Sequence, residues 1–157
     1  MLCTINTDAS FNRKRKIGTF AFWSKMNTTT IKRSGKLRGS VDKSCEAELK
    51  TIINAIHVTL EREAEITRVI VNTDSMNSIH ILTNSKKDIR RYKLQWGGKF
   101  YYAYRKTLEQ FPCVKNIEYR HVKSHSGVQD ARSYVNEWCD TMAKREMEKV
   151  ISKEKQK

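Results

Sequence analysis

Two short segments of the chain lead into an aspartate through the same kind of sequence. Residues 5–8 read Ile-Asn-Thr-Asp and residues 71–74 read Val-Asn-Thr-Asp, so Asp8 and Asp74 each end a predicted β-strand. If these strands are parallel neighbours, both carboxylates emerge at the sheet edge where open α/β sheets bind ligands. A strand-end aspartate is otherwise a turn former or a helix cap, and capping is a serious alternative for Asp74, which precedes a predicted helix.

Further acids could join this pair from two predicted helices. Glu46 and Glu48 both begin the first long helix, on opposite sides of its apolar stripe, so periodicity does not choose between them. Asp140 lies in the last helix, directly after the stripe residue Cys139. Acids in a first helical turn are often only partners of the helix dipole, which is the alternative interpretation of the two glutamates.

Carboxylates gathered at one point favour a particular chemistry. They repel one another and raise their own pKa values unless a cation offsets the charge. Carboxylate oxygens select hard divalent ions, Mg²⁺ or Mn²⁺, rather than zinc. A pair of such ions activates a water and stabilises the leaving oxygen of a phosphodiester, so the pattern favours hydrolysis of a polyphosphate.

The elements that would position these acids alternate between strand and helix patterns. The sequence predicts strands over residues 2–7, 17–24, 28–33, 67–73 and 116–122. It predicts helices over residues 44–63, 75–83, about 99–110 and about 135–148. The apolar centre of 67–73 indicates burial on both faces. This order indicates an α/β fold: a five-stranded mixed sheet, three strands antiparallel and two parallel, with helices on both faces.

Length and composition indicate one domain. The chain has 157 residues, four cysteines without CxxC spacing and no apolar run of membrane-spanning length. We expect a catalytic domain over residues 1–150 and a polar tail over 151–157 that is frayed from residue 152. Without a signal peptide the cysteines are interpreted as reduced thiols, which favours a cytoplasmic protein, with a nuclear or viral context left open. We expect a monomer that uses no small-molecule cofactor and no membrane.

The net charge of +14 is concentrated in two segments. Residues 11–38 hold nine basic residues and no acid, and residues 84–106 hold eight basic residues, one acid and six aromatic residues. Cations neutralise phosphates and aromatic rings stack on bases, so the two segments favour a nucleic-acid surface. A solubilising face is the alternative; an anionic membrane is less favoured because neither segment has an amphipathic helical period.

Five motifs, in this order along the chain, resemble type 1 ribonuclease H. They are residues 7–10 (Thr-Asp-Ala-Ser), 47–49 (Ala-Glu-Leu), 73–75 (Thr-Asp-Ser), 122–127 (Val-Lys-Ser-His-Ser-Gly) and 136–140 (Asn-Glu-Trp-Cys-Asp). The resemblance implies a ribonuclease H fold that hydrolyses the RNA strand of an RNA–DNA hybrid with two Mg²⁺ ions, for which Mn²⁺ can substitute. It implies metal-binding roles for Asp8, Glu48, Asp74 and Asp140. It also implies that His125, in a loop, transfers protons or assists product release.

The same resemblance suggests which residues contact the substrate. The basic, aromatic stretch 84–106 is similar to the substrate-binding protrusion of many family members. The substrate-binding residues that we expect are Ser10, Ser44, Lys86, Lys87, Arg90, Arg91, Trp96, Lys99 and Asn136. Three features depart from the family pattern: Ala9 replaces the usual glycine, residues 42–45 (Asp-Lys-Ser-Cys) lack the usual asparagines, and the interval from His125 to Asp140 is longer.

Two other functions remain open at this point. A DNA-directed nuclease of the same fold, of the integrase or resolvase type, is compatible with the acids and with the departure at residues 42–45. A non-catalytic nucleic-acid-binding domain is the other, although all four acids are retained. Zinc is not favoured, because His57 and His80 have no partner at ligand spacing and the pair His121 and His125 has no nearby cysteine.

Overall fold

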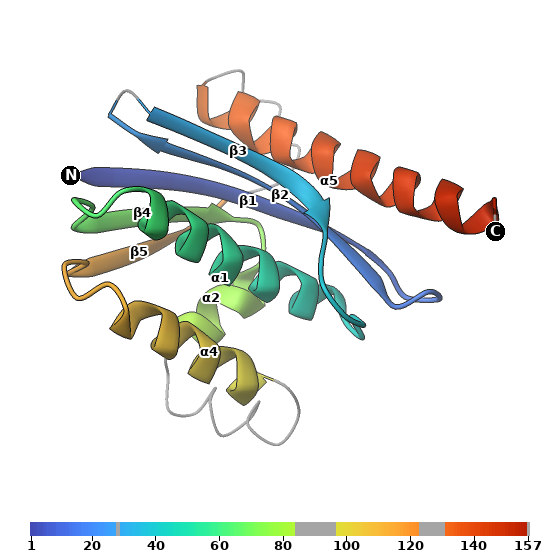
Figure 1. Ribbon diagram of the computed structural model, residues 1–157, viewed down its shortest axis with the longest axis horizontal. Helices are drawn as coiled ribbons and strands as arrows, with labels where there is room; N and C mark the ends of the chain where they lie inside the picture. The colour runs from blue at the N-terminus through green and yellow to red at the C-terminus, as the bar shows by residue number, and fades with distance from the viewer. Residues whose placement is uncertain (28, 84–96, 123–130, 157) are drawn as a thin grey trace.

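The computed structural model describes residues 1–27, 29–83, 97–122 and 131–156 (Figure 1). The strands are β1 (Leu2–Asn12), β2 (Ile17–Met26), β3 (Thr29–Lys36), β4 (Arg68–Thr73) and β5 (Asn116–His121). The helices are α1 (Ser44–Arg62), α2 (Met76–Leu82), α4 (Gly97–Glu109) and α5 (Ala131–Lys155). The predicted order of elements is therefore confirmed for the described residues.

The strands form one five-stranded mixed sheet in the order β3-β2-β1-β4-β5. β1 pairs with β2, and β2 with β3, antiparallel. β1 pairs with β4, and β4 with β5, parallel. The sheet thus has the antiparallel and parallel halves that the sequence predicts, and β1 lies between them.

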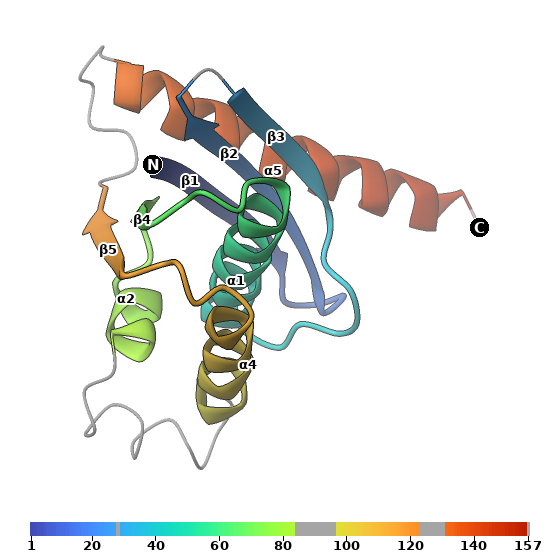
Figure 2. The ribbon, with the colours of Figure 1, turned by 60° about the vertical axis from the view of Figure 1, so that its left-hand side comes forward.

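Helices cover both faces of this sheet (Figure 2). α1 packs on β1 and β2 and contacts α2 and α4 on the same side, while α5 crosses β1, β2 and β3 on the other. The main core lies under α1 and includes Ile5, Phe22, Leu49, Ile52 and Val71, all fully buried. No helix in the described ranges is both long enough and apolar enough to cross a membrane.

Two elements, β1 and α5, extend furthest beyond their predicted ends. β1 continues past Asp8 to Asn12, and its turn into β2 is closed by a hydrogen bond of 3.0 Å from the Arg15 backbone nitrogen to Asn12 Oδ1. α5 continues to Lys155, so the prediction that the chain frays from residue 152 is wrong for residues 152–155. Arg15 of the β1–β2 turn forms an ion pair with Glu154, which ties the end of α5 to the sheet.

Candidate metal centre

The parallel pairing of β1 and β4 sets the positions of two of the predicted acids. Asn6 is in register with Asn72, and the Asn72 side-chain amide donates a hydrogen bond of 2.6 Å to Asn6 Oδ1. Asp8 and Asp74 each lie two residues beyond this pair. The repeated Asn-Thr-Asp sequence thus places two carboxylates side by side, because matched residues of parallel strands advance together.

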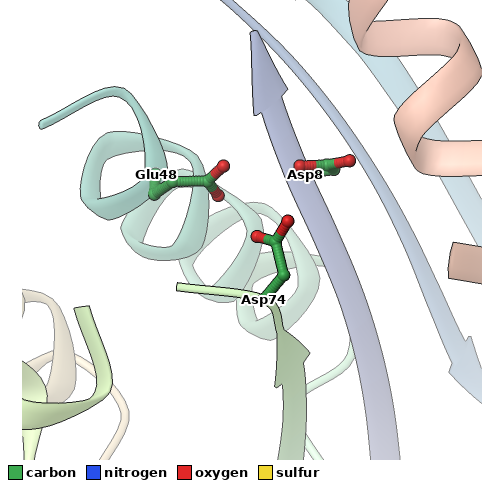
Figure 3. A group of neighbouring side chains, drawn as sticks. All are labelled: Asp8, Glu48 and Asp74. Atoms are coloured by element: carbon green, nitrogen blue, oxygen red, sulfur yellow. The ribbon is translucent and has the colours of Figure 1, made fainter. Parts of the chain in front are cut away.

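Glu48 joins them from the first turns of α1 (Figure 3). Asp8, Glu48 and Asp74 each offer one oxygen, and the three oxygens lie within 4.8 Å of one another. In Figure 3 the three carboxylates point toward one another from β1, from α1 and from the end of β4. Among the described residues, this is the group of acidic side chains that can share a cation.

Glu46 has a different task, which resolves the ambiguity between the two glutamates. Its carboxylate accepts a hydrogen bond of 2.9 Å from the backbone nitrogen of Asp42 and lies 3.5 Å from Lys50 Nζ. Glu46 therefore fixes the chain entering α1, whereas Glu48 faces β1. Both glutamates are largely buried, with exposed fractions of 9% and 7%.

Close packing holds the start of α1 against the sheet. Ala47 belongs to a buried cluster with Leu37 and Val41. Gly18 of β2 lies under this cluster, and a Cβ atom there would come within 2.9 Å of Leu37 Cδ1 and 3.4 Å of Ala47 Cβ. The absence of a side chain at position 18 therefore lets α1 approach the sheet closely enough for Glu48 to reach Asp8 and Asp74.

Asp74 is not the cap of the helix that follows it. Ser75 is the N-cap of α2, and its hydroxyl accepts a hydrogen bond of 3.2 Å from the Ser78 backbone nitrogen. The capping alternative for Asp74 is therefore excluded, and its carboxylate is left for the cluster.

Asp140 lies beside this group but is paired differently. It is close enough to Asp8 to raise the pKa of that carboxyl, and it accepts a hydrogen bond of 3.0 Å from Lys144 Nζ one turn along α5. Two contacts anchor α5 here: Thr19 Oγ1 donates to the Ala143 carbonyl at 2.7 Å, and Cys139 Sγ donates to the Asn6 carbonyl at 3.4 Å. Three of the four expected carboxylates thus share one site, and the fourth is next to it.

His121 is a neighbour of the site that the sequence analysis did not identify. Its Nε2 lies 3.2 Å from the backbone oxygen of Asp74, because β5 ends in register with β4 and pairs His121 with Thr73. The charge of His121 opposes the rise in the Asp74 pKa. No local sequence pattern indicates this proximity, which follows from strand register alone.

Burial raises the pKa values of all three carboxyl groups, and repulsion between neighbouring acids raises them further. Burial, followed by the charge of Asp74 and contacts with Asp140, raises the pKa of Asp8 from 3.8 to about 8. Burial and the charges of Asp8 and Asp74 raise the pKa of Glu48 well above its usual value. Burial is also the main cause that raises the pKa of Asp74.

The donor set fits a hard divalent cation. All the oxygens are carboxylate oxygens, which Mg²⁺ and Mn²⁺ prefer. Glu48 Oε2 is buried and has no hydrogen-bond partner in the described part of the chain. A bound cation would satisfy this oxygen and offset the repulsion that raises the three pKa values.

The structure describes some of the other expected site residues and leaves the rest outside its described ranges. Ser10 lies on β1, two residues past Asp8, and is half-buried; Ser44 is the exposed first residue of α1; Asn136 is half-buried in α5. Lys99 falls within α4. The remaining six lie outside the described residues: Lys86, Lys87, Arg90, Arg91, Trp96 and His125.

A five-stranded sheet in this order, with helices on both faces, an acid within β1 and a second acid directly after β4, is the ribonuclease H fold. The family model for RNase H matches residues 2–148, and the chain belongs to that family. A comparison with curated protein sequences gave no significant match.

Solved structures agree on the fold. RNase H1 from the halophilic archaeon Halobacterium salinarum NRC-1 aligns with a TM-score of 0.66 at 14% identity, covering 95% of this chain and 99% of that one. The N-terminal RNase H domain of Rv2228c from Mycobacterium tuberculosis, a fusion with maltose binding protein, gives 0.68 at 14%, covering 97% of each. The protease–reverse transcriptase of prototype foamy virus gives 0.62 at 16%, covering 92% of this chain and 20% of that one.

Proposed function

We propose that residues 1–150 form a metal-dependent endoribonuclease that hydrolyses the RNA strand of RNA–DNA hybrids. One observation carries the proposal: in a chain of this family, oxygens of Asp8, Glu48 and Asp74 lie within 4.8 Å of one another. Such an arrangement is costly in a protein without ions, as the raised pKa values indicate, and it is useful when divalent cations are bound.

We propose two Mg²⁺ ions, replaceable by Mn²⁺, as the cofactors, held by Asp8, Glu48, Asp74 and Asp140. When bound, such ions supply Lewis-acid stabilisation of developing negative charge and lower the pKa of a coordinated water. The protein's own part is positional. β1 and β4 hold two carboxylates in register, α1 adds the third, and α5 carries the fourth within reach of Asp8.

His125 is proposed to move a proton near this site or to assist product release. Its imidazole is suited to either task because the ordinary pKa of histidine is near neutral. His121 is a separate group that lies against Asp74, and its role is to position that residue.

The charge of the chain supports a nucleic-acid substrate. The chain has a net charge of +14 and a cluster of acidic side chains, so the protein attracts a polyanion while the cluster attracts cations. We propose that Ser10, Ser44 and Asn136 contact the substrate next to the carboxylates. We propose that Lys86, Lys87, Arg90, Arg91, Trp96 and Lys99 also contact the duplex.

The test is a substrate panel with matched variants. Labelled RNA–DNA hybrid, RNA duplex and DNA duplex of one sequence are incubated with Mg²⁺, with Mn²⁺ and with EDTA. We expect cleavage of the RNA strand of the hybrid with either ion and none in EDTA. Folded wild-type protein that leaves the hybrid intact with both ions would refute the nuclease, and preferential cutting of the DNA duplex would instead identify a DNA-directed nuclease.

Glu48→Gln and Glu46→Gln form a matched pair for this panel. The two residues lie on one helix with similar burial, but only Glu48 belongs to the carboxylate cluster. We expect Glu48→Gln to reduce the cleavage rate at least about 100-fold while hybrid binding in EDTA persists. Glu46→Gln should lose some stability and keep its cleavage rate; equal losses in the two variants would exclude Glu48 from the mechanism.

A further inference from the structure

A cavity lies on the sheet face that carries α5, next to the carboxylate site. It has a volume of about 490 Å³, which is within the range of small-ligand pockets. Asn6 and Asp8 are two residues apart on β1, so their side chains emerge on the same face about 7 Å apart along the strand. The cavity and the candidate metal centre are therefore neighbours on one surface.

Strand register builds the floor of this cavity. Trp23 of β2, Asn6 of β1 and Asn72 of β4 form one row across the sheet, and Lys25 and Thr4 lie in the next row. The first turns of α5 contribute Tyr134 to the wall. α5 packs across β1, β2 and β3, and the cavity lies where the start of this helix faces the residues of β1, β2 and β4 that line it.

The floor carries an unsatisfied polar group. Asn72 is only 1% exposed, and its Nδ2 donates to Asn6 Oδ1 at 2.6 Å. Asn72 Oδ1 has no hydrogen-bond partner among the described residues. Buried amide oxygens in folded proteins are nearly always paired, so Asn72, which lines the cavity, has an unused acceptor that a small rotation of its side chain would offer to a ligand.

Two aromatic residues and one lysine also line the cavity. Trp23 and Tyr134 meet edge to face, with ring centroids 6.0 Å apart and planes at 78°. Tyr134 is 63% exposed although it is a large aromatic residue, so its ring is open to a flat partner. Lys25 is exposed and lines the same cavity.

We infer that this cavity binds one unpaired nucleotide. A planar base packs on Tyr134 and against Trp23, the base edge exchanges hydrogen bonds with the Asn6–Asn72 pair, and Lys25 binds the phosphate. The ligand is an anion with a flat, hydrogen-bonding ring, which a chain of net charge +14 attracts. The nucleotide is free in solution or is the exposed base of a single strand, and the two sources share this chemistry.

The test measures binding in EDTA, where no hydrolysis occurs. Isothermal titration of the full chain uses adenosine 5′-monophosphate, ribose 5-phosphate as the probe without a base, and a five-nucleotide single-stranded DNA. We expect the nucleotide or the DNA to bind more tightly than ribose 5-phosphate. Tyr134→Ala should weaken that binding about 5- to 150-fold, which is the usual range for loss of one base–aromatic stack.

Matched control variants distinguish binding in this cavity from non-specific binding elsewhere. Tyr102 of α4 is 62% exposed but lies in stretch 84–106, which is expected to contact the duplex, so Tyr102→Ala is a control for the mononucleotide only. It should change mononucleotide binding little. Lys25→Gln should reduce the slope of log DNA affinity against log salt concentration by about 1. Lys153→Gln, at the far end of α5, should leave this slope unchanged. Circular dichroism melts verify that each variant is folded.

The outcomes are distinct from those of the nuclease test. Dependence on Tyr134 with the mononucleotide assigns a site for free nucleotides, and dependence with the DNA alone assigns a site for a single strand. If neither probe binds more tightly than ribose 5-phosphate, if Tyr134→Ala weakens the binding of neither probe, or if Tyr134→Ala and Tyr102→Ala weaken mononucleotide binding equally, the inference is wrong. Tyr134 is not one of the carboxylate residues of the candidate metal centre. Tyr134→Ala should therefore still cleave the hybrid if the proposed function holds.

Discussion

Replacing Asp8 by asparagine should stabilise the metal-free protein while removing its activity. In the native protein the pKa of Asp8 rises from 3.8 to about 8, first because the carboxyl is buried and then because Asp74 and Asp140 lie close to it. At pH 7 the unfolded chain ionises this carboxyl, whereas the folded protein holds it protonated. Folding therefore carries a cost that asparagine, which is neutral in both states, does not have.

The size of the effect follows from the shift. Binding a proton at pH 7 to a group whose unfolded pKa is 3.8 costs about 4 kcal/mol. Part of this cost belongs to the neighbouring acids, which ionise more easily when Asp8 is neutral, so we expect a gain of about 2 kcal/mol. For a chain of this size the melting temperature would rise by about 4–8 °C. In Asp8→Asn the side-chain amide oxygen can still accept the hydrogen bond of 2.9 Å that Ala9 N donates to Asp8 Oδ1 in the wild type.

The pH dependence identifies the cause. A carboxyl whose folded pKa is raised costs no stability below its unfolded pKa, and the cost grows as the pH rises toward the folded pKa. The difference between Asp8→Asn and the wild type should therefore be near zero at pH 4, increase to about pH 8 and stay constant above it. Asp42→Asn, at an exposed acid, should show no comparable increase.

Thermal melts in EDTA between pH 4 and 9 measure this difference. Adding Mg²⁺ at pH 8 should raise the melting temperature of the wild type and affect Asp8→Asn much less, because bound ions stabilise only the protein that holds them. A variant that is less stable than the wild type at every pH, or a gain that does not change with pH, would refute the raised pKa of Asp8 in the folded protein.

Three further predictions test the surroundings of the carboxylates. Lys144→Met removes the ammonium group that pairs with Asp140 at 3.0 Å, so half-maximal cleavage should need up to about fivefold less Mg²⁺; a higher requirement would contradict competition between the lysine and the ion. His121→Phe removes the charge that opposes the rise in the Asp74 pKa, so the acidic limb of the pH–rate profile should move to higher pH, and an unchanged limb would separate the two residues. Gly18→Ala should cost about 1–3 kcal/mol in urea unfolding, because the new methyl would lie 2.9 Å from a facing leucine side chain; unchanged stability would show that α1 can move away freely.

The sequence predicts that Asp8 and Asp74 lie close together, because equivalent residues of a repeated sequence become neighbours when the two strands pair in parallel and in register. Asn6 and Asn72 are in register, so the aspartates two residues on must lie side by side. The choice between Glu46 and Glu48 could not be made from periodicity. It depends on how α1 is rotated about its axis, and the Asp42 backbone nitrogen settles that rotation by binding Glu46.

Other features depend on contacts between distant segments. The helical state of residues 152–155 is supported by the ion pair of Arg15 with Glu154, 139 positions away, and no local pattern predicts it. The approach of His121 to Asp74 likewise depends on the pairing of β5 with β4. The pair of Asp140 and Lys144, in contrast, has the spacing of four residues that brings side chains together on a helix, and the sequence alone could have indicated it.

The position of the acids inside a basic chain implies that metal and substrate bind together. Without ions, the carboxyl groups of Glu48 and its neighbours are either protonated or negatively charged. In the charged form they repel a phosphodiester. Bound cations reverse the sign of the site, so each ligand should increase the affinity for the other by the same factor. Hybrid affinity of the wild type should therefore rise when Ca²⁺, a hard cation, replaces EDTA. Glu48→Gln, with one anionic ligand fewer, should show a smaller rise. An equal rise in both proteins would place the cation effect on the basic surface instead of the carboxylates.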